Sequence, residues 1–379
     1  MKTAAIICEY NPFHNGHKYQ IEEAKKTNDA VVCIMSGSFV QRGDIAVFDK
    51  WTRANAALSS GCDLVLELPV CFSLNSAEQF SFGGVSLAEN LGIVDNLIFG
   101  SESGNIEKLE NTAELLLNET DEISEEIKKY MSLGNSYPKS RTLAYSNTID
   151  EDLLTEPNNI LGIEYIKAIK TIKSSITPQT IKRNSVSHHD MSATDSFASA
   201  TLIREMLKNN DDISQFVPVP YPKHNRKDKI NELLRYKLLE MSKEEISQIN
   251  DVTEGLENRI KEAVKECITF SEMCEYIKSK RYTLARIRRI LLSCLIGIDK
   301  NIAKIPPSYI RVLGATQKGL KLLSEIKKNS GLPIITKTAD FKGYNKSFEL
   351  DIKATDIYNI ICNKPLGEDF HKSPTIKKV

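Results

Sequence analysis

The sequence of 379 residues predicts an α/β fold in which helices cover both faces of a parallel sheet. Short apolar runs without an alternating pattern recur along the first half of the chain, and segments with helical periodicity separate them. Strands with continuous apolar character are typical of parallel sheets, because such strands are buried on both faces. Four such runs lie before residue 222, and a fifth strand is predicted at 177–183. We therefore expect a Rossmann-like, five-stranded parallel sheet in this part of the chain.

The expected elements follow one another in a regular order. Strands are predicted at 4–8, 30–35, 64–69, 96–100 and 177–183, and helices from residue 16 or 17 onward and at 49–59, 76–91, 160–172 and 199–208. Ser76 is suited to cap the start of one helix, and Gly92 is suited to end it. Residues 105–130 are acidic and helical, whereas residues 134–158 are polar and predict a long excursion from the sheet.

A proline-rich connector divides the chain. The three prolines between Val217 and Pro222 cannot continue a helix, so we expect a catalytic domain at 1–222 and a basic, mostly helical region at 223–379. The first range carries a net charge of −11 and the second a net charge of +11, which favours a polyanion as the partner of the second range. Within the range 223–379, the sequence predicts strands at 309–313 and 332–336, a helix at 318–328 and a low-complexity polar tail after Gly367.

Several classes of protein are disfavoured by the sequence. The apolar stretch Met1–Cys8 is too short for a signal peptide, and no window holds the ~18 apolar residues of a membrane span. The eight cysteines form no C-x-x-C pair and indicate core thiols in a reducing compartment. We therefore expect a cytoplasmic protein without a protein-bound metal site. The segment His188-His189-Asp190 is interpreted as a polar loop and not as a metal or base site.

The segment from Asn11 to His17 is the sharpest functional motif. It follows a predicted strand and opens a predicted helix, so it lies where parallel sheets bind ligands. His14 and His17 are three residues apart at the helix start and share one face, from which both imidazoles can reach phosphate oxygens. Gly16 lets a base or a ribose approach the backbone, and the helix N-terminus favours an anion. The pattern indicates a nucleotide site.

Longer motifs resemble those of the bacterial tRNA(Met) cytidine acetate ligase family, which belongs to the H-x-G-H nucleotidylyl transferase superfamily. The similar segments are EYNPFHNGH at 9–17, MSGSFVQRGD at 35–44, DLVLELP at 63–69 and PNNILG at 157–162. The resemblance covers the first half of the chain, whereas the second half is similar in architecture only. It implies that ATP activates acetate as acetyl-adenylate, without acetyl-CoA, and that the acetyl group passes to the wobble cytidine of elongator tRNA(Met), giving N4-acetylcytidine.

The resemblance also implies a set of site residues. The implied ATP site comprises Ile7, Cys8, Glu9, Tyr10, Asn11, Pro12, Phe13, His14, Asn15, Gly16, His17, Lys18, Tyr19, Gln20, Gly100, Asn158, Arg183 and Asn184. The start of the helix at 199–208 resembles the superfamily's late S-[ST]-x-x-[IL]-R signature, although Ala200 stands where a hydroxyl residue is common. Its Ser199 and Thr201 are expected to contact the triphosphate. His14, His17 and Arg204 are expected to stabilise the leaving pyrophosphate. ATP is expected to bring Mg²⁺, for which the sequence shows no carboxylate cluster.

Two further groups of residues are candidates for substrate contacts. Gln41, Arg42 and Asp44 follow the second strand and are expected to bind acetate or the acceptor. A basic cluster in the second half is expected to bind tRNA phosphates and comprises Lys278, Lys280, Arg281, Arg286, Arg288 and Arg289. Reversing Arg288 and Arg289 to Glu is expected to weaken tRNA binding and to leave acetate-dependent ATP turnover intact.

Two other functions stay open at the level of sequence. The chain could be a nucleotidyltransferase that adenylylates a small phosphorylated acceptor, or a non-catalytic RNA-binding protein that senses a nucleotide. The 157 basic-region residues at 223–379 disfavour the first alternative, and intact His14, Gly16 and His17 disfavour the second. ATP–pyrophosphate exchange with acetate and without RNA distinguishes the three.

Overall fold

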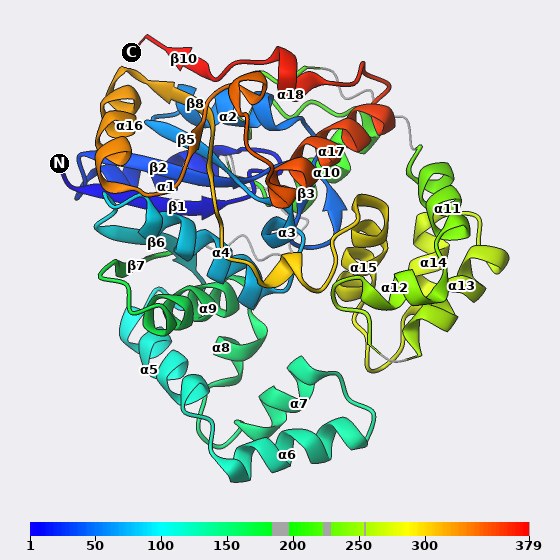
Figure 1. The fold of residues 1–379 in the computed structure, drawn as a ribbon. Coiled ribbons are helices and arrows are strands. Elements are labelled where there is room, and N and C mark those ends of the chain that lie inside the picture. Colours follow the sequence, from blue (N-terminus) through cyan, green and yellow to red (C-terminus); the bar gives the residue numbers. More distant parts are fainter. Residues whose placement is uncertain (184–196, 223–228, 254, 379) are drawn as a thin grey trace.

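The computed structural model describes residues 1–183, 197–222, 229–253 and 255–378, and a sheet lies at its centre (Figure 1). Five parallel strands have the order β5-β2-β1-β6-β7. Their bounds are Thr3–Cys8 for β1, Ala30–Ser36 for β2, Leu64–Leu68 for β5, Asn96–Ser101 for β6 and Thr177–Lys182 for β7. The expected five-stranded parallel sheet is thus confirmed. The chain order reverses between β1 and β6, and ligands bind at the carboxyl ends of strands at such a point.

The end of the chain extends this sheet. Strand β8 (Ile310–Thr316) pairs antiparallel with β5, and β9 (Ile334–Ile335) and β10 (Thr375–Lys377) pair parallel with β8. The strands expected at 309–313 and 332–336 are present, but they complete the first sheet, where β8 covers an edge that β5 would otherwise expose. The polar tail after Gly367 also contains α18 (Glu368–His371), so it is more structured than its composition predicts.

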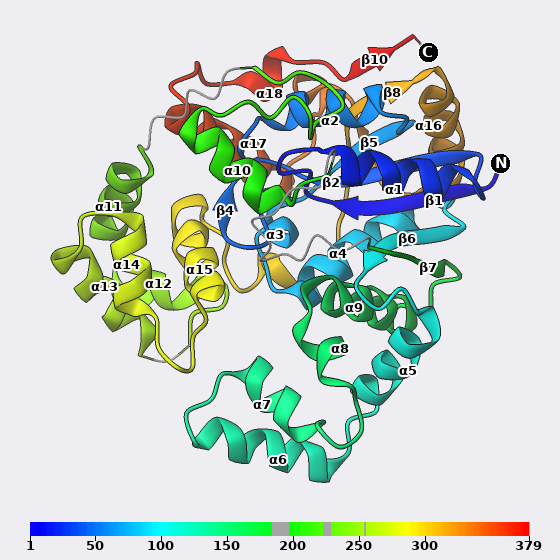
Figure 2. The same ribbon diagram turned by 180° about the vertical axis from the view of Figure 1, so that it is seen from behind.

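Helices cover both faces of the sheet (Figures 1 and 2). One face packs against α1 (Asn15–Lys25) and α2 (Lys50–Ser59), and the other against α3 (Val70–Ser73), α4 (Ala77–Asn90), α9 (Pro157–Thr171) and α16 (Gln317–Asn329). The predicted cap is present, because the Ser76 side chain accepts a hydrogen bond from the Gln79 N–H at the start of α4. Helix α10 (Ala200–Asn209) packs on a smaller apolar cluster around Phe48.

Two groups of helices project from the sheet (Figure 1). The first lies between β6 and α9 and comprises α5 (Ile106–Leu117), α6 (Asp121–Ser132), α7 (Tyr137–Ala144) and α8 (Glu151–Thr155). The second, called here the helical module, comprises α11 (Ile230–Glu240), α12 (Lys243–Gln248), α13 (Leu256–Glu266), α14 (Phe270–Ile277) and α15 (Leu284–Ile296). Helix α17 (Lys346–Ile361) then returns the chain to the sheet. None of the described helices has both the length and the apolar character that a membrane crossing requires.

A cluster of charged side chains lies in the core and joins the chain's end to its first half. The Lys50 ammonium on α2 lies 2.8 Å from Glu67 Oε2 and 2.8 Å from Asp369 Oδ1. Arg311 of β8 lies 3.4 Å from the same oxygen of Asp369. All four side chains are buried, so each charge depends on its partners for compensation. The cluster fixes α18 against the sheet.

Candidate active site

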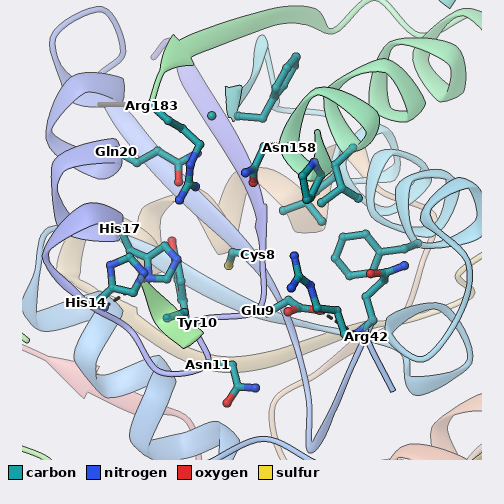
Figure 3. Close-up of a pocket in the computed structure, with 18 of the residues that line it drawn as sticks. Cys8, Glu9, Tyr10, Asn11, His14, His17, Gln20, Arg42, Asn158 and Arg183 are labelled. Atoms are coloured by element: carbon teal, nitrogen blue, oxygen red, sulfur yellow. Dashed lines mark hydrogen bonds between the residues drawn. The ribbon is translucent and has the colours of Figure 1, made fainter. Parts of the chain in front are cut away.

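A crevice lies at the carboxyl ends of β1 and β6, and its space, open solvent included, amounts to about 1040 Å³. Figure 3 shows His14 and His17 on one side of this pocket and Glu9 and Arg42 on the other. The residues that line it are Ile7, Cys8, Glu9, Tyr10, Asn11, His14, His17, Gln20, Gln41, Arg42, Phe80, Phe99, Gly100, Pro157, Asn158, Leu161, Tyr165, Arg183, Ala200 and Arg204.

The two imidazoles are held by the start of helix α1. His14 is its N-cap, where Nδ1 accepts a hydrogen bond from the Gly16 N–H at 3.0 Å. His17 Nδ1 accepts from the His14 N–H at 3.3 Å, and the two rings stack with centroids 3.7 Å apart. A nitrogen that accepts carries no proton, so each neutral ring carries its proton on Nε2. The helix thus fixes two imidazole donors at its N-terminus, a position that favours anions.

His17 is kept neutral by its surroundings. Burial, the neighbouring His14 and the Arg183 guanidinium lower the pKa of His17 well below its usual value of 6.5. A neutral imidazole can still donate from Nε2, and it keeps the Nδ1 acceptor that the His14 backbone requires. The Cβ of a residue other than glycine at position 16 would lie 2.9 Å from His14 Cε1. Gly16 therefore makes room for the His14 ring itself.

Arginine side chains supply positive charge around the imidazoles. Arg204 of α10 donates from Nη1 to the Asn11 carbonyl at 2.9 Å and from Nη2 to Thr201 Oγ1 at 3.0 Å. Arg183 follows β7, and its Cγ would lie 3.2 Å from a Cβ at Gly100. The glycine thus makes room for the arginine stem. Burial lowers the pKa of both guanidinium groups, but arginine remains charged at neutral pH.

Asn158 is oriented by a carboxylate outside the crevice. Glu102 Oε1 accepts from Asn158 Nδ2 at 2.5 Å and from its backbone N–H at 3.3 Å, and Oε2 accepts from the Asn159 N–H at 2.8 Å. An ionised carboxylate only accepts hydrogen bonds, so the amide nitrogen of Asn158 must face Glu102. Its Oδ1 is therefore left for a donor from the pocket. Figure 3 shows this side chain directed into the pocket.

A short hairpin closes the other side of the crevice. Strands β3 (Phe39–Val40) and β4 (Asp44–Ile45) flank the loop that carries Gln41 and Arg42 to the pocket lining. The Gln41 N–H donates to Glu9 Oε1 at 2.6 Å, and burial raises the pKa of the Glu9 carboxyl. Asp44 does not line the crevice, because its Oδ1 pairs with Arg288 Nη1 of the helical module at 2.6 Å.

Arg53 supports the same region and was not among the predicted site residues. Its side chain is fully buried and donates to the carbonyls of Phe48 at 2.9 Å, Glu9 at 2.6 Å and Ser36 at 3.0 Å, and also to that of Gly37. These carbonyls belong to the segment that follows β1, to the end of β2 and the residue after it, and to the turn before α2. One buried cation thus fixes the segments that bring Glu9 and the hairpin to the crevice.

The implied ATP residues are only partly gathered at the crevice. A second cavity shares His14, His17, Gln20, Gly100 and Arg183 with the first and adds Gly16, Tyr19, Ile181, Lys182 and Phe197. Four residues of the implied ATP segment 7–20 line neither cavity, namely Pro12, Phe13, Asn15 and Lys18. Ser199 caps α10 and Thr201 accepts from Arg204, and neither lines the two cavities. Asn184 and the segment 188–190 lie outside the described residues.

The basic cluster expected to bind tRNA divides into two parts. Lys278, Lys280 and Arg281 are exposed. Three arginines of α15 instead contact other parts of the protein. Arg288 pairs with Asp44, and Arg286 donates to the Asp251 carbonyl at 2.8 Å. Arg289 lies 3.7 Å from Asp251 Oδ2 and 3.4 Å from the Gln41 carbonyl. Their partners are distant in sequence, so the charge run alone could not predict this packing.

Other lining residues carry no signal that sequence reasoning could use. Phe80, Phe99, Leu161 and Tyr165 line the crevice, yet they follow the same apolar periodicity as core residues. No group of three or more His, Cys, Asp or Glu side chains among the described residues could hold a metal ion.

The chain is similar to known proteins over its whole length. The model of the HIGH Nucleotidyl Transferase family matches residues 1–372. A tRNA(Met) cytidine acetate ligase of Clostridium botulinum (strain Okra / Type B1) is 42% identical, covering 100% of this chain and 99% of the relative. The ligase of Clostridium novyi (strain NT) is 41% identical, with 100% of each covered. A crystal structure of Thermotoga maritima TmcAL bound with alpha-thio ATP has a TM-score of 0.87 and 32% identity, with 100% of each chain covered. The chain therefore belongs to the HIGH nucleotidyl transferase family and, within it, to the tRNA(Met) cytidine acetate ligases.

Proposed function

We propose that the protein is an ATP-dependent ligase that activates acetate as acetyl-adenylate and acetylates N4 of the wobble cytidine in elongator tRNA(Met). The pair of stacked imidazoles at the N-terminus of α1 carries this proposal, because it presents fixed donors to a polyphosphate at the switch point of the sheet. The names of the relatives support the choice of acetate and of tRNA(Met). A tRNA substrate places the reaction in the cytoplasm.

The first step needs no nucleophile from the protein. An oxygen of acetate attacks the α-phosphorus of ATP, and the bond from that phosphorus to the β-bridging oxygen breaks, which yields acetyl-adenylate and pyrophosphate. Negative charge grows on the leaving pyrophosphate, where His14, His17 and Arg204 are placed to stabilise it. Mg²⁺ enters with the nucleotide, since it is commonly bound through substrate phosphates and waters.

The second step transfers the acetyl group to RNA. The exocyclic N4 of cytidine attacks the acetyl carbonyl, the bond from the carbonyl carbon to the phosphate oxygen breaks, AMP leaves, and the nitrogen loses one proton. The mixed anhydride supplies the driving force, so acetyl-CoA is not required. The protein's part is to hold the amine and the anhydride together and to exclude water.

The helical module is proposed as the main tRNA contact. Lys278, Lys280 and Arg281 lie at the α14–α15 connection, and their exposed ammonium and guanidinium groups can reach phosphates. Arg288 and Arg289 instead join the module to the hairpin that lines the crevice. The range 223–379 is therefore proposed to bind tRNA through the module, while its last part completes the sheet.

One experiment tests the whole proposal. The protein is incubated with ATP, labelled acetate and transfer RNA, and the nucleosides are analysed by mass. We expect labelled N4-acetylcytidine in tRNA(Met) and, without RNA, pyrophosphate exchange that depends on acetate. A His14→Ala and His17→Ala double variant serves as the control and is expected to lose both activities. Exchange that requires a phosphorylated small molecule in place of acetate, or ATP binding without any exchange, would overturn the proposal.

A further inference from the structure

Five apolar side chains form one wall of the crevice. Ile7 lies on β1, Phe99 on β6, Phe80 on α4, and Leu161 and Tyr165 on α9, and all five line the pocket. Phe80 is 2% exposed, Phe99 and Tyr165 are 4% exposed, and the Phe99 and Tyr165 rings lie 5.6 Å apart. Most of each surface is already packed, so the wall presents a small apolar area to the cavity. This set is called here the apolar wall.

Glycines behind the apolar wall prevent it from moving back. A Cβ at Gly162 of α9 would lie 2.5 Å from Cε2 of Phe99, and a Cβ at Gly84 of α4 would lie 2.6 Å from Cδ1 of Ile7. Both helices therefore lie directly against these side chains. A packed interior of this kind yields little to a larger ligand. The apolar wall thus sets a fixed limit on the length of whatever group contacts it.

The position of the apolar wall separates it from the region suited to the nucleoside. The second cavity lies next to α1 and β7, is bordered by Gly16 and Gly100, and shares His14 and His17 with the crevice. A nucleoside in that cavity places its phosphates at the imidazoles. An acid that attacks the α-phosphorus must approach in line with the leaving pyrophosphate, and therefore from a different region. The apolar wall shares the first crevice with Glu9 and Arg42, which lie on the side of the pocket away from the imidazoles (Figure 3), and none of its five residues lines the second cavity.

We propose that the apolar wall is the acyl subsite, which takes the methyl group of acetate and excludes longer monocarboxylic acids; this inference rests on the proposed function. The wall carries one polar atom, the Tyr165 hydroxyl, so a nucleobase there would leave its edge groups unpaired. Arg42 lines the same pocket and supplies the cation for the carboxylate end. Glu9 lines the same pocket, and burial raises the pKa of its carboxyl.

The test is a change of acid preference on removing one part of the apolar wall. Pyrophosphate exchange is measured with acetate, propionate and butyrate for the wild-type protein and for Leu161→Ala. One methylene is worth about 10-fold to 200-fold in discrimination, so we expect the wild type to prefer acetate over propionate by that margin. Leu161→Ala is expected to lower the ratio at least tenfold. Phe80→Leu, on another helix, is a second variant with the same expected direction.

The control is Ile163→Ala, which removes a buried side chain from the same helix without lining the crevice. It is expected to lower stability and to leave the acid preference unchanged. Suppose that the wild type exchanges with acetate, but that both wall variants keep the wild-type ratio of acetate to propionate or raise only the KM for ATP. The proposal of an acyl subsite is then wrong, and the proposed function stands. If the wild type exchanges with no carboxylic acid at all, the proposed function fails and the subsite fails with it.

Discussion

Replacing Glu102 by Gln isolates the contact that orients Asn158. The Glu102 carboxylate accepts three hydrogen bonds at the start of α9, two from Asn158 and one from the Asn159 N–H. Helix α9 has no side-chain cap of its own, since its N-cap Glu156 makes no such bond. A glutamine keeps one acceptor oxygen and turns an amide nitrogen toward the remaining N–H. The substitution therefore removes at least one bond and the negative charge.

The magnitude follows from these losses. A hydrogen bond to a charged group contributes about 1.5–3 kcal/mol, and a carboxylate at a helix N-terminus contributes about 0.3–1 kcal/mol. Glu102 is half-buried, so solvent reduces both. We expect Glu102→Gln to lower the free energy of unfolding by about 2 kcal/mol. If the amide of Asn158 also turns, its oxygen leaves the pocket, and the KM for ATP should rise about tenfold, which corresponds to ~1.4 kcal/mol.

Two measurements check this prediction. Urea denaturation followed by circular dichroism gives the stability, and pyrophosphate exchange at varied ATP gives the KM. The matched control is Glu107→Gln, an exposed carboxylate in the first turn of α5, which is expected to change stability by less than about 0.5 kcal/mol. An unchanged KM together with lost stability would mean that Glu102 only caps α9. Unchanged stability would refute the hydrogen-bond reasoning itself.

Three further predictions concern other parts of the molecule. Because burial keeps the pKa of His17 well below 6.5 in the folded protein, the unfolded chain binds a proton at this residue at a higher pH than the folded chain does. The Tm should therefore fall as the pH drops below about 6.5, and His17→Asn should make that fall smaller. Lys280→Glu with Arg281→Glu removes two cations, so it should weaken tRNA binding and make its salt dependence shallower by about two units of slope, with acetate-dependent exchange unchanged. Lys50→Met leaves Glu67 and Asp369 facing each other in the core and should cost about 3–5 kcal/mol in urea denaturation. Lys18→Met, at a half-buried lysine whose pair with Glu22 lies at the surface, should cost less than about 1 kcal/mol.

Local patterns were sufficient for the strands of the parallel sheet. The four apolar runs that predicted strands are β1, β2, β5 and β6, because a chain segment buried on both faces has few alternatives. The fifth strand, β7, lies at the end of the strand order and is only partly buried. The pairing of β8 with β5 could not be predicted, since it joins segments about 250 residues apart and depends on which edge is left open. Asp369 shows the same limit. Its partners Lys50 and Arg311 are distant in sequence, so a buried charge in the polar tail has the composition of an exposed one.

The part of the candidate site that a local sequence motif forms could be predicted. The part that side chains from separate elements form could not. Two histidines and a glycine at a helix start indicate anion binding on their own. The groups that orient them or complete the pocket come from separate elements. Glu102 fixes Asn158 from the end of β6, and Arg53 fixes the Glu9 carbonyl from α2. Neither position has an unusual neighbour in sequence, so only the fold identifies it.

The hairpin between β3 and β4 changes what the basic cluster is expected to do. The loop that carries Gln41 and Arg42 into the crevice is also the surface on which α15 packs, and a Cβ at Gly43 would lie 2.5 Å from Cβ of Arg288. Reversing Arg288 and Arg289 to Glu places negative charge against Asp44 and Asp251. The double reversal should therefore lower acetate-dependent exchange as well as tRNA binding, in contrast to the expectation from the sequence. Exchange at the wild-type rate in that variant would show that the loop holds its place without α15.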